Sequence, residues 1–291
     1  MSSLKNAIPF SRATVIGTGL IGGSFALALR RHFPNITITG FDEPDVANRA
    51  LGRDAVQEIT GDMASAVRGA DLIYMALPIA KILELMPLVA GHAKPEALVT
   101  DAGSTKISIC AEGAKLFRNG ARFLGGHPIA GKEVSGIENA DENLFRNTRY
   151  PLIAEENDAD PRVQAFARIL RTVGAVPVWC DAETHDWAAG VVSHLPQLLA
   201  VALASVIREE TDETGLPLSL AGPGVKDMLR LAGSPYGVWR DITHTNSENI
   251  ARALDRLGQA IEHLRTNLTS KELEKEFRAA NEIYRSLQKQ G

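Results

Sequence analysis

The sequence predicts an α/β domain with a doubly wound, mostly parallel sheet, followed by an all-helical domain. Between residues 12 and 180, short apolar runs typical of buried strands alternate with runs of helical spacing. That alternation is the pattern of a parallel sheet covered by helices on both faces. After Asp181 the strand-like runs stop, and helical spacing continues towards the end of the chain. We therefore expect two domains, residues 1–181 and residues 182–291.

The elements of the first domain follow one another in the order of a doubly wound fold. Strands are expected at residues 13–16, 37–42, 56–59, 71–78, 97–101, 121–124, 150–154 and 175–179. Helices are expected at residues 23–31, 62–68, 79–90, 105–117 and 160–173. In such a sheet, ligands bind outside the carboxyl ends of the strands, so residues at these ends are the first candidates for function.

The second domain is expected to consist of helices at residues 182–210, 218–231, 247–268 and 270–288. Glycine and proline residues separate these helices. Residues 188–207 are apolar almost all round and long enough to span a membrane, but polar side chains occupy their first half. This pattern favours the centre of a helical domain or a subunit interface over a membrane span.

Composition limits the classes of function. The chain has 291 residues, 45% of them hydrophobic, and a net charge of −4 without a basic run, which argues against a nucleic-acid partner. Residues 1–12 lack the features of a signal peptide. The two cysteines, Cys110 and Cys180, show no metal-binding spacing and suit a reducing compartment. We expect a cytoplasmic protein with no membrane segment and no bound metal.

A glycine-rich turn, Gly17-Thr18-Gly19-Leu20-Ile21-Gly22, lies between the first expected strand and the first helix. In this context G-x-G-x-x-G is typical of a Rossmann-type dinucleotide-binding domain. Gly17 allows the tight turn, Gly19 lets a pyrophosphate approach the backbone, and Gly22 lets the helix pack on the strand. The helix N-terminus then offers free N–H groups and a partial positive charge to the phosphates.

Asp42 ends the second expected strand, twenty residues after Gly22. A carboxylate at this distance accepts hydrogen bonds from the adenosine ribose and repels a 2′-phosphate, so NAD is favoured over NADP. The alternative is that Asp42 only caps a helix or turn before Glu43 and Pro44.

Three further clusters follow expected strands. Leu77 and Pro78 form an apolar wall for a cofactor, and Ser104 offers a hydroxyl to a substrate or the nicotinamide, or caps the next helix. His127 follows two glycines and is the expected catalytic base or hydrogen-bond acceptor, because a neutral imidazole takes a proton near neutral pH. The alternative is a structural histidine that binds a neighbouring loop.

Polar residues of the second domain suit an anionic substrate. His194 and Gln197 open the long apolar helix, and Lys226 and Arg230 share a helical face at i and i+4, followed by Trp239. Arg binds carboxylates bidentately, and an aromatic residue near it suits a ring-shaped substrate. The alternatives are a buried structural histidine, a local amide contact and a surface ion-pair face.

Six stretches together resemble the prephenate/arogenate (cyclohexadienyl) dehydrogenase family of tyrosine biosynthesis, over residues 13–286. They are the glycine turn with Gly23-Ser24, Asp101-Ala102-Gly103-Ser104-Thr105-Lys106, Gly125-Gly126-His127-Pro128-Ile129-Ala130-Gly131, His185-Asp186, Ser193-His194-Leu195-Pro196, and Lys226-Asp227 through Trp239-Arg240-Asp241. The resemblance implies NAD(P)-linked oxidative decarboxylation of prephenate or arogenate by a homodimer joined through its helical domains.

The resemblance also implies roles for single residues. His127 accepts the proton of the ring hydroxyl, Ser104 lies near that hydroxyl and the nicotinamide, and Arg230, assisted by Lys226, binds a carboxylate. Trp239 matches a residue that reaches across the dimer towards the active site. The substrate-binding residues are expected to be His194, Gln197, Lys226, Arg230, Trp239, Lys132 and Glu133.

One position departs from the family pattern. Many prephenate-using members have a second histidine where this chain has Gln197. A glutamine side chain both donates and accepts hydrogen bonds but does not become cationic, which keeps arogenate open as the substrate. Two other classes of function remain alternatives: a 6-phosphogluconate-dehydrogenase-like or imine-type reductase, and a non-catalytic NAD-binding sensor.

Overall fold

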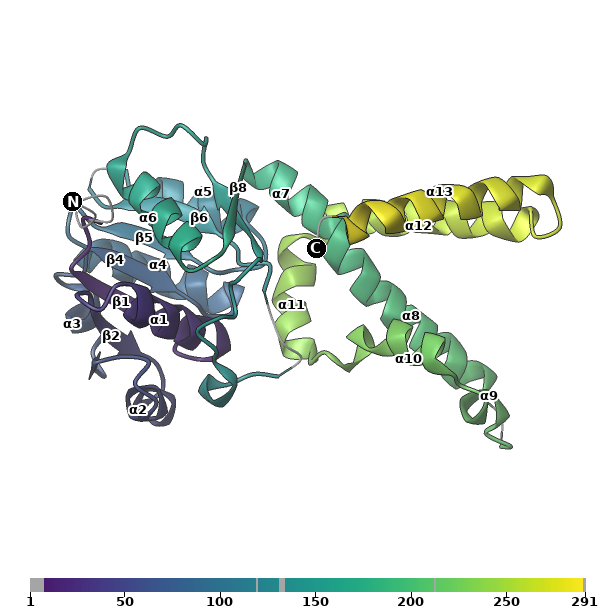
Figure 1. Ribbon diagram of the computed structural model, residues 1–291, viewed down its shortest axis with the longest axis horizontal. Helices are drawn as coiled ribbons and strands as arrows, with labels where there is room; N and C mark the ends of the chain where they lie inside the picture. The colour runs from purple at the N-terminus through teal and green to yellow at the C-terminus, as the bar shows by residue number, and fades with distance from the viewer. Residues whose placement is uncertain (1–7, 119, 131–133, 212, 290–291) are drawn as a thin grey trace.

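The computed structural model describes residues 8–118, 120–130, 134–211 and 213–289. One sheet with strand order β3-β2-β1-β4-β5-β6-β7-β8 forms the centre of the first domain, and helices lie on both of its faces (Figure 1). Every neighbouring pair of strands is parallel except β6 and β7, which are antiparallel. The predicted fold class is confirmed.

The strands are β1 Arg12–Ile16, β2 Thr37–Phe41, β3 Glu58–Ile59, β4 Leu72–Met75, β5 Leu98–Asp101, β6 Arg122–Gly126, β7 Arg149–Ile153 and β8 Val176–Cys180. The α-helices of the first domain are α1 Leu20–His32, α2 Pro44–Gly52, α3 Met63–Val67, α4 Ile79–His92, α5 Ile107–Leu116 and α6 Pro161–Thr172. Those that follow are α7 Ala182–Ala189, α8 Leu195–Glu210, α9 Leu216–Ser219, α10 Pro223–Leu229, α11 Tyr236–Thr245, α12 Ser247–Thr266 and α13 Lys271–Gln288. Short 3₁₀ turns are η1 Ile137–Asn139 and η3 Leu231–Gly233, and η2 Gly190–His194 is a π-helical turn.

The core consists of two apolar clusters, one on each face of the sheet. Successive residues of a strand point to opposite faces, so Tyr74 joins the cluster under α1 and α6, whereas Met75 joins the cluster under α3, α4 and α5. In the first cluster the ring of Phe25 stacks on that of Tyr74 at a centroid distance of 4.0 Å. Burial on both faces explains why the central strands are continuous apolar runs.

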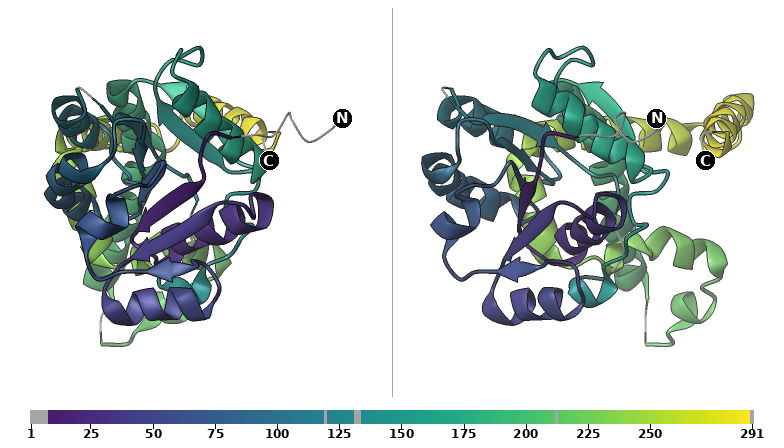
Figure 2. Two further views of the ribbon diagram at one scale, coloured as in Figure 1. Left: turned by 90° about the vertical axis from the view of Figure 1, so that its left-hand side faces the viewer. Right: turned by 60° about the vertical axis from the view of Figure 1, so that its left-hand side comes forward.

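The second domain is built on one long helical segment, in which α7, η2 and α8 continue into one another from Ala182 to Glu210. Helices α9 and α10 return beside α8, and α12 and α13 form a second pair (Figure 1). We call the first group, α8 with α9 and α10, and the second pair, α12 with α13, the two arms of the domain. Figure 2 shows that they project away from the sheet domain in different directions. Among the described residues, Ala182–Glu210 is long and apolar enough to cross a membrane by length and composition alone, and 22% of its most apolar window is buried.

Two helices were not expected from the sequence, and one expected helix is wrong. Helix α2 begins at Pro44, which occupies the first turn, where a missing N–H costs nothing. Helix α11 follows Pro235 at its N-cap. The helix expected at residues 218–231 is interrupted, because Pro223 holds Gly222 in an extended conformation and begins a new helix, α10.

Candidate active site

The glycine turn after β1 has the geometry of a dinucleotide site. Gly17 has a φ of +89°, which favours glycine, and a Cβ at Gly22 would lie 1.8 Å from the carbonyl oxygen of Gly17. A Cβ at Gly19, in contrast, would meet no atom within 4 Å. The turn is therefore tight where it packs on the strand and open in front of the α1 N-terminus, where an anion would bind.

Asp42 lies beside this turn, at the end of β2. Its Oδ2 accepts a hydrogen bond of 2.6 Å from the backbone N–H of Thr18, and its Oδ1 accepts one of 2.8 Å from the N–H of Glu43. The N-cap of α2 is Glu43, so Asp42 is not the cap of that helix. The carboxylate is fixed at the edge of the glycine turn, which is the position predicted for a ribose ligand.

A cavity of about 460 Å³ extends from the glycine turn across the carboxyl ends of β4 and β5. Its walls include Gly19, Leu77, Pro78 and Ser104, and α11 contributes Val238 from the second domain. The glycine turn, the apolar wall and the strand-end serine predicted from the sequence therefore lie around one cavity. A cavity that reaches from the glycine turn to the ends of β4 and β5 is where a dinucleotide would bind in this type of sheet.

His127 lies at the end of β6 and lines a second cavity of about 810 Å³, which lies between α7 and the β6–β8 part of the sheet. Ala130 lines both cavities, so the two adjoin behind the loop that follows His127. Burial lowers the pKa of His127 well below 6.5, and the neighbouring His185, Lys106 and His194 lower it further. His127 is consequently neutral near pH 7, the state in which an imidazole accepts a proton or a hydrogen bond.

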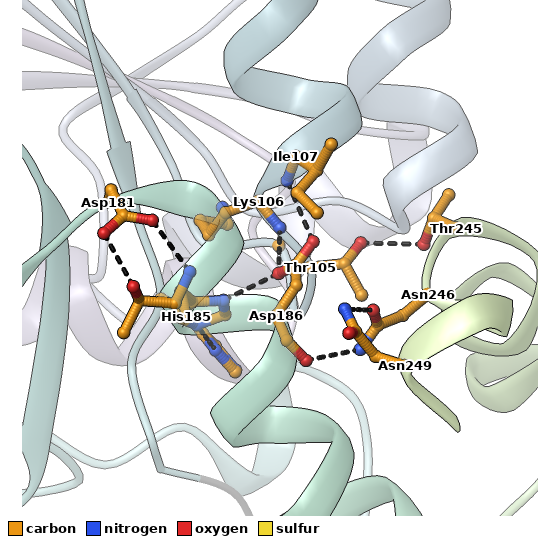
Figure 3. A network of polar contacts seen from close by, with 12 residues as sticks. Thr105, Lys106, Ile107, Asp181, His185, Asp186, Thr245, Asn246 and Asn249 are labelled. Carbon is orange, nitrogen blue, oxygen red and sulfur yellow. Dashed lines mark hydrogen bonds and ion pairs between the residues drawn. The ribbon is translucent and has the colours of Figure 1, made fainter. Parts of the chain in front are cut away.

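A chain of side chains runs from His127 into the second domain. Nδ1 of His127 lies 2.9 Å from Nε2 of His185, and Nδ1 of His185 lies 2.7 Å from Oδ1 of Asp186. Asp186 also accepts hydrogen bonds from the backbone N–H groups of Lys106, at 2.7 Å, and Ile107, at 2.9 Å (Figure 3). Asp186, and not Ser104, thus provides the side-chain cap for the start of α5.

A buried ion pair lies beneath the same strand ends. Lys106 and Asp101 form a salt bridge with both side chains fully buried, and Lys106 Nζ also donates to the carbonyl oxygen of Gly126, at 2.7 Å. Asp101 accepts hydrogen bonds from the N–H groups of Gly103, at 2.8 Å, and Gly126, at 3.1 Å. The pair therefore ties the turn that carries Ser104 to the turn that carries His127.

Three second-domain residues that were expected to bind substrate make contacts within their own chain. His194 is 1% exposed, and its Nδ1 lies 3.1 Å from Nδ2 of Asn246. The ring of Trp239 packs edge-on against that of His194 in its own chain, at a centroid distance of 5.9 Å. Gln197 is 3% exposed and donates from Nε2 to the carbonyl oxygen of Leu231, at 2.8 Å. These side chains link η2, α8, α11 and η3: His194 and Gln197 are buried where the helices meet, and Trp239 is partly buried.

The cationic residues predicted to bind substrate, Lys226 and Arg230, lie outside the described linings of the two cavities. Lys226 on α10 and Arg230 at its C-cap are exposed on the arm beside α8, and among the described residues neither lines the two cavities. Lys132 and Glu133, also expected to bind substrate, lie outside the described residues. Within the described part of the chain, no group of histidine, cysteine and acidic side chains is arranged to hold a metal ion.

Comparison with known proteins agrees with this arrangement. Residues 25–179 match the model of the prephenate dehydrogenase nucleotide-binding domain, and residues 181–282 match that of the prephenate dehydrogenase dimerization domain. The chain belongs to the prephenate dehydrogenase family. Prephenate dehydrogenase of Lactococcus lactis subsp. cremoris is 32% identical over 282 residues, which cover 93% of this chain and 77% of that protein.

Solved structures of the prephenate dehydrogenase family share the whole fold. The enzyme from A. aeolicus, in complex with hydroxyphenyl propionate and NAD+, has a TM-score of 0.87 and 28% identity and covers 97% of this chain and 99% of its own. Synechocystis arogenate dehydrogenase has a TM-score of 0.81 and 28% identity over 96% of this chain and 99% of its own. This family member is an NAD-dependent dehydrogenase, which leaves the reductase and sensor alternatives without support.

Sequence reasoning missed the connections that hold the site of this prephenate dehydrogenase family member. His185 and Asp186 were recognised as a motif without a role, although an acid that directly follows a histidine near a helix start is a signal for a paired imidazole. Asn246, which binds both His194 and the carbonyl oxygen of Asp186, had no sequence signal, since its partners are 52 and 60 residues away.

Proposed function

We propose that this chain catalyses the NAD-dependent oxidative decarboxylation of prephenate, arogenate or both in tyrosine biosynthesis. The carrying observation is that His127, whose pKa is lowered by burial, lines a cavity that adjoins at Ala130 the cavity of Ser104 and the glycine turn, in a chain of this family. The relatives' names include both prephenate and arogenate dehydrogenases, so both substrates belong to the proposal.

The proposed chemistry uses His127 as an acceptor. Bound NAD takes the hydride from ring carbon C4, while His127 takes the proton of the hydroxyl on that carbon. Loss of carbon dioxide from C1 makes the ring aromatic, and His127 returns the proton to the phenolate oxygen. Ser104, in the adjoining cavity, orients the hydroxyl or the nicotinamide.

Substrate carboxylates are proposed to bind to the second domain. Arg230 is the proposed carboxylate ligand and Lys226 assists it, because a guanidinium binds a carboxylate in two parallel hydrogen bonds. Both residues lie on the arm that carries α10, outside the described linings of the two cavities, so the proposal requires this arm to approach the site of its own chain or of a second chain. Lys132 and Glu133, which follow His127 in the sequence, complete the proposed set.

Cofactor recognition is proposed to run through Gly17-Thr18-Gly19-Leu20-Ile21-Gly22, with Leu77 and Pro78 along the nicotinamide side. Asp42, fixed by the N–H of Thr18, presents a negative charge where NADP carries its 2′-phosphate. We therefore propose that NAD is used in preference to NADP.

A homodimer is part of the proposal, and the matched family domain is described as a dimerization domain. Apolar side chains lie exposed on α13, with Phe277 64%, Ile283 66% and Leu287 62% exposed. A second copy of the chain would cover this face and that of α8, which supports a subunit interface over a membrane span. Sedimentation equilibrium at micromolar concentration tests this, and a monomer would contradict it.

The division of the chain near Asp181 and a cytoplasmic location complete the proposal. Asp181 caps α7 directly after β8, where the sheet ends and the helices begin. Cys110 and Cys180 are both free thiols, which suits a reducing compartment.

The function is tested with the purified protein, NAD and either prephenate or arogenate. We expect NADH and carbon dioxide to form in equal amounts, with 4-hydroxyphenylpyruvate or tyrosine as the product. NADH without carbon dioxide would indicate a simple alcohol oxidation and contradict the proposal.

A further inference from the structure

The contact between His127 and His185 continues into a buried carboxylate. We propose that His185 and Asp186 are positioning residues that hold His127 in the tautomer whose Nε2 accepts the substrate proton. This inference rests on the proposed function, in which His127 is the acceptor. It assigns a task to two residues that have no role in the proposed chemistry above.

Asp186 is the fixed end of this chain of contacts. Its side chain is fully buried, Oδ1 accepts the N–H of Lys106 and Oδ2 accepts the N–H of Ile107. Both oxygens face the N-terminus of α5, where N–H groups and the helix dipole favour a negative charge. Because backbone donors hold both oxygens, Asp186 meets Nδ1 of His185 as an acceptor.

The tautomers of both rings follow from that acceptor. His185 donates from Nδ1 to Asp186, so in the neutral ring Nε2 of His185 carries a lone pair. Nδ1 of His127, 2.9 Å away, must then donate to this nitrogen. The neutral ring of His127 is left with its lone pair on Nε2, which is the atom able to accept a proton from a substrate.

His127, His185 and Asp186 form a relay of hydrogen-bonded side chains. Several contacts hold the start of α7, which carries His185 and Asp186, in place. Asp181 caps α7 by accepting the N–H of Thr184 at 2.8 Å, and the N–H of His185 donates to the carbonyl oxygen of Asp181 at 3.0 Å. The carbonyl oxygen of Asp186 accepts Nδ2 of Asn246 at 2.7 Å (Figure 3). The start of α7 is thereby held from both domains, and the orientation of His127 depends on their contact.

Charges around His127 set its response to pH. Lys106 from the β5–α5 turn, Arg149 from β7, and the histidines 185 and 194 from the α7–η2 segment lie near it, with the carboxylates of Asp101 and Asp186 behind them. Asp186 is the anion joined to His127 through a hydrogen-bonded ring, so it stabilises the imidazolium that forms when His127 takes a proton. Its removal therefore lowers the pKa of that imidazolium.

The test compares His185→Leu and Asp186→Asn with His263→Ala as the matched control. The control removes a histidine–carboxylate contact of 3.4 Å, with Glu276, on the exposed α12–α13 arm. In His185→Leu we expect kcat to fall about 100-fold while the KM values of NAD and substrate change less than about twofold, because only proton acceptance is impaired. In His263→Ala we expect both constants to stay at the wild-type values.

Two measurements distinguish a role of His185 and Asp186 in orienting His127 from a role in stabilising the fold alone. Nitrogen NMR of histidine-labelled protein at neutral pH should show His127 protonated at Nδ1 in the wild type, and at Nε2 in part of the His185→Leu molecules. In Asp186→Asn the acid limb of kcat/KM should move to lower pH. Asp186→Asn keeps the inference testable if His185→Leu does not fold.

Three results would overturn the inference: an unchanged His127 tautomer in His185→Leu, a kcat within about threefold of wild type, or a loss of kcat with an unmoved acid limb in Asp186→Asn. The NMR readout requires no turnover. A wild-type protein inactive on prephenate and arogenate, but with His127 protonated at Nδ1, would thus count against the proposed function and not against the relay.

Discussion

Nε2 of Gln197 donates a hydrogen bond of 2.8 Å to the carbonyl oxygen of Leu231, the residue that follows Arg230. The contact ties α8 to the end of α10 and therefore fixes the backbone next to the proposed carboxylate ligand. We propose that Gln197 acts on substrate binding through the position of Arg230.

Replacing Gln197 by leucine should weaken substrate binding without impairing the chemical step. A lost hydrogen bond costs about 1 kcal/mol, so we expect KM for the substrate to rise about fivefold to tenfold while kcat stays near its wild-type value. Gln164→Leu is the matched control, since Gln164 also donates Nε2 to a backbone carbonyl, at 2.9 Å, far from the site. Equal KM values in the two variants would contradict the role of Gln197.

His127→Asn should remove the proton acceptor and leave cofactor binding intact. We expect kcat to fall about 1,000-fold, the usual scale of general base catalysis, with an unchanged dissociation constant for NAD. Steady-state rates and a fluorescence titration with NAD measure the two quantities, with the exposed His92→Ala as control. If the variant kept a tenth of the wild-type turnover, His127 would not be the acceptor.

Arg230→Ala should raise KM for the substrate about 100-fold, because a charge-assisted bidentate contact contributes roughly 2–3 kcal/mol. Arg230→Lys should give an intermediate value, since an ammonium keeps the charge but not the paired geometry. Arg278→Ala, which removes an exposed arginine of α13, serves as the control for charge alone. An unchanged KM in Arg230→Ala would exclude this residue from the carboxylate site.

Buried histidines predict how stability depends on pH. Burial lowers the pKa of His194 to about 4, so between pH 6.5 and 4 the unfolded chain binds a proton that the folded chain does not. The free energy of unfolding should therefore decrease as the pH is lowered from 6.5 to 4. His194 alone should account for about 2–3 kcal/mol of this decrease. His127, with its pKa also lowered, adds to the same trend.

Urea unfolding at pH 7 and pH 4 measures this dependence, and His194→Gln is the informative variant. A glutamine stays neutral and can still accept from Asn246, so the difference in unfolding free energy between the two pH values should shrink by the contribution of His194. The same pH dependence in the variant and the wild type would show that His194 takes no part in it.

The first domain was predictable because its strands are buried on both faces and read as apolar runs between glycine turns. Leu72–Met75 and Leu98–Asp101 lie inside the expected strands, and the ends of these strands brought Ser104 to the predicted edge of the sheet. Helix α2 was not among the expected helices, although Pro44 lies in its first turn, where a proline fits.

The second domain was less predictable because its details depend on contacts between distant residues. The π-helical turn at Gly190–His194 turns His194 towards Asn246, and no local pattern distinguishes it from an α-helix. Gln197 was expected to face the substrate, yet its partner Leu231 is 34 residues away. Spacing along one helix identifies a shared face but not the element that covers it.

The central claim is tested most directly by initial rates of the purified protein with prephenate and with arogenate, each with NAD and with NADP. The account predicts turnover of at least one of the two cyclohexadienes. It also predicts a higher kcat/KM with NAD than with NADP, because the proposed ribose ligand Asp42 would repel a 2′-phosphate. A higher kcat/KM with NADP would contradict the role of Asp42, and no turnover of either substrate would contradict the proposed function itself.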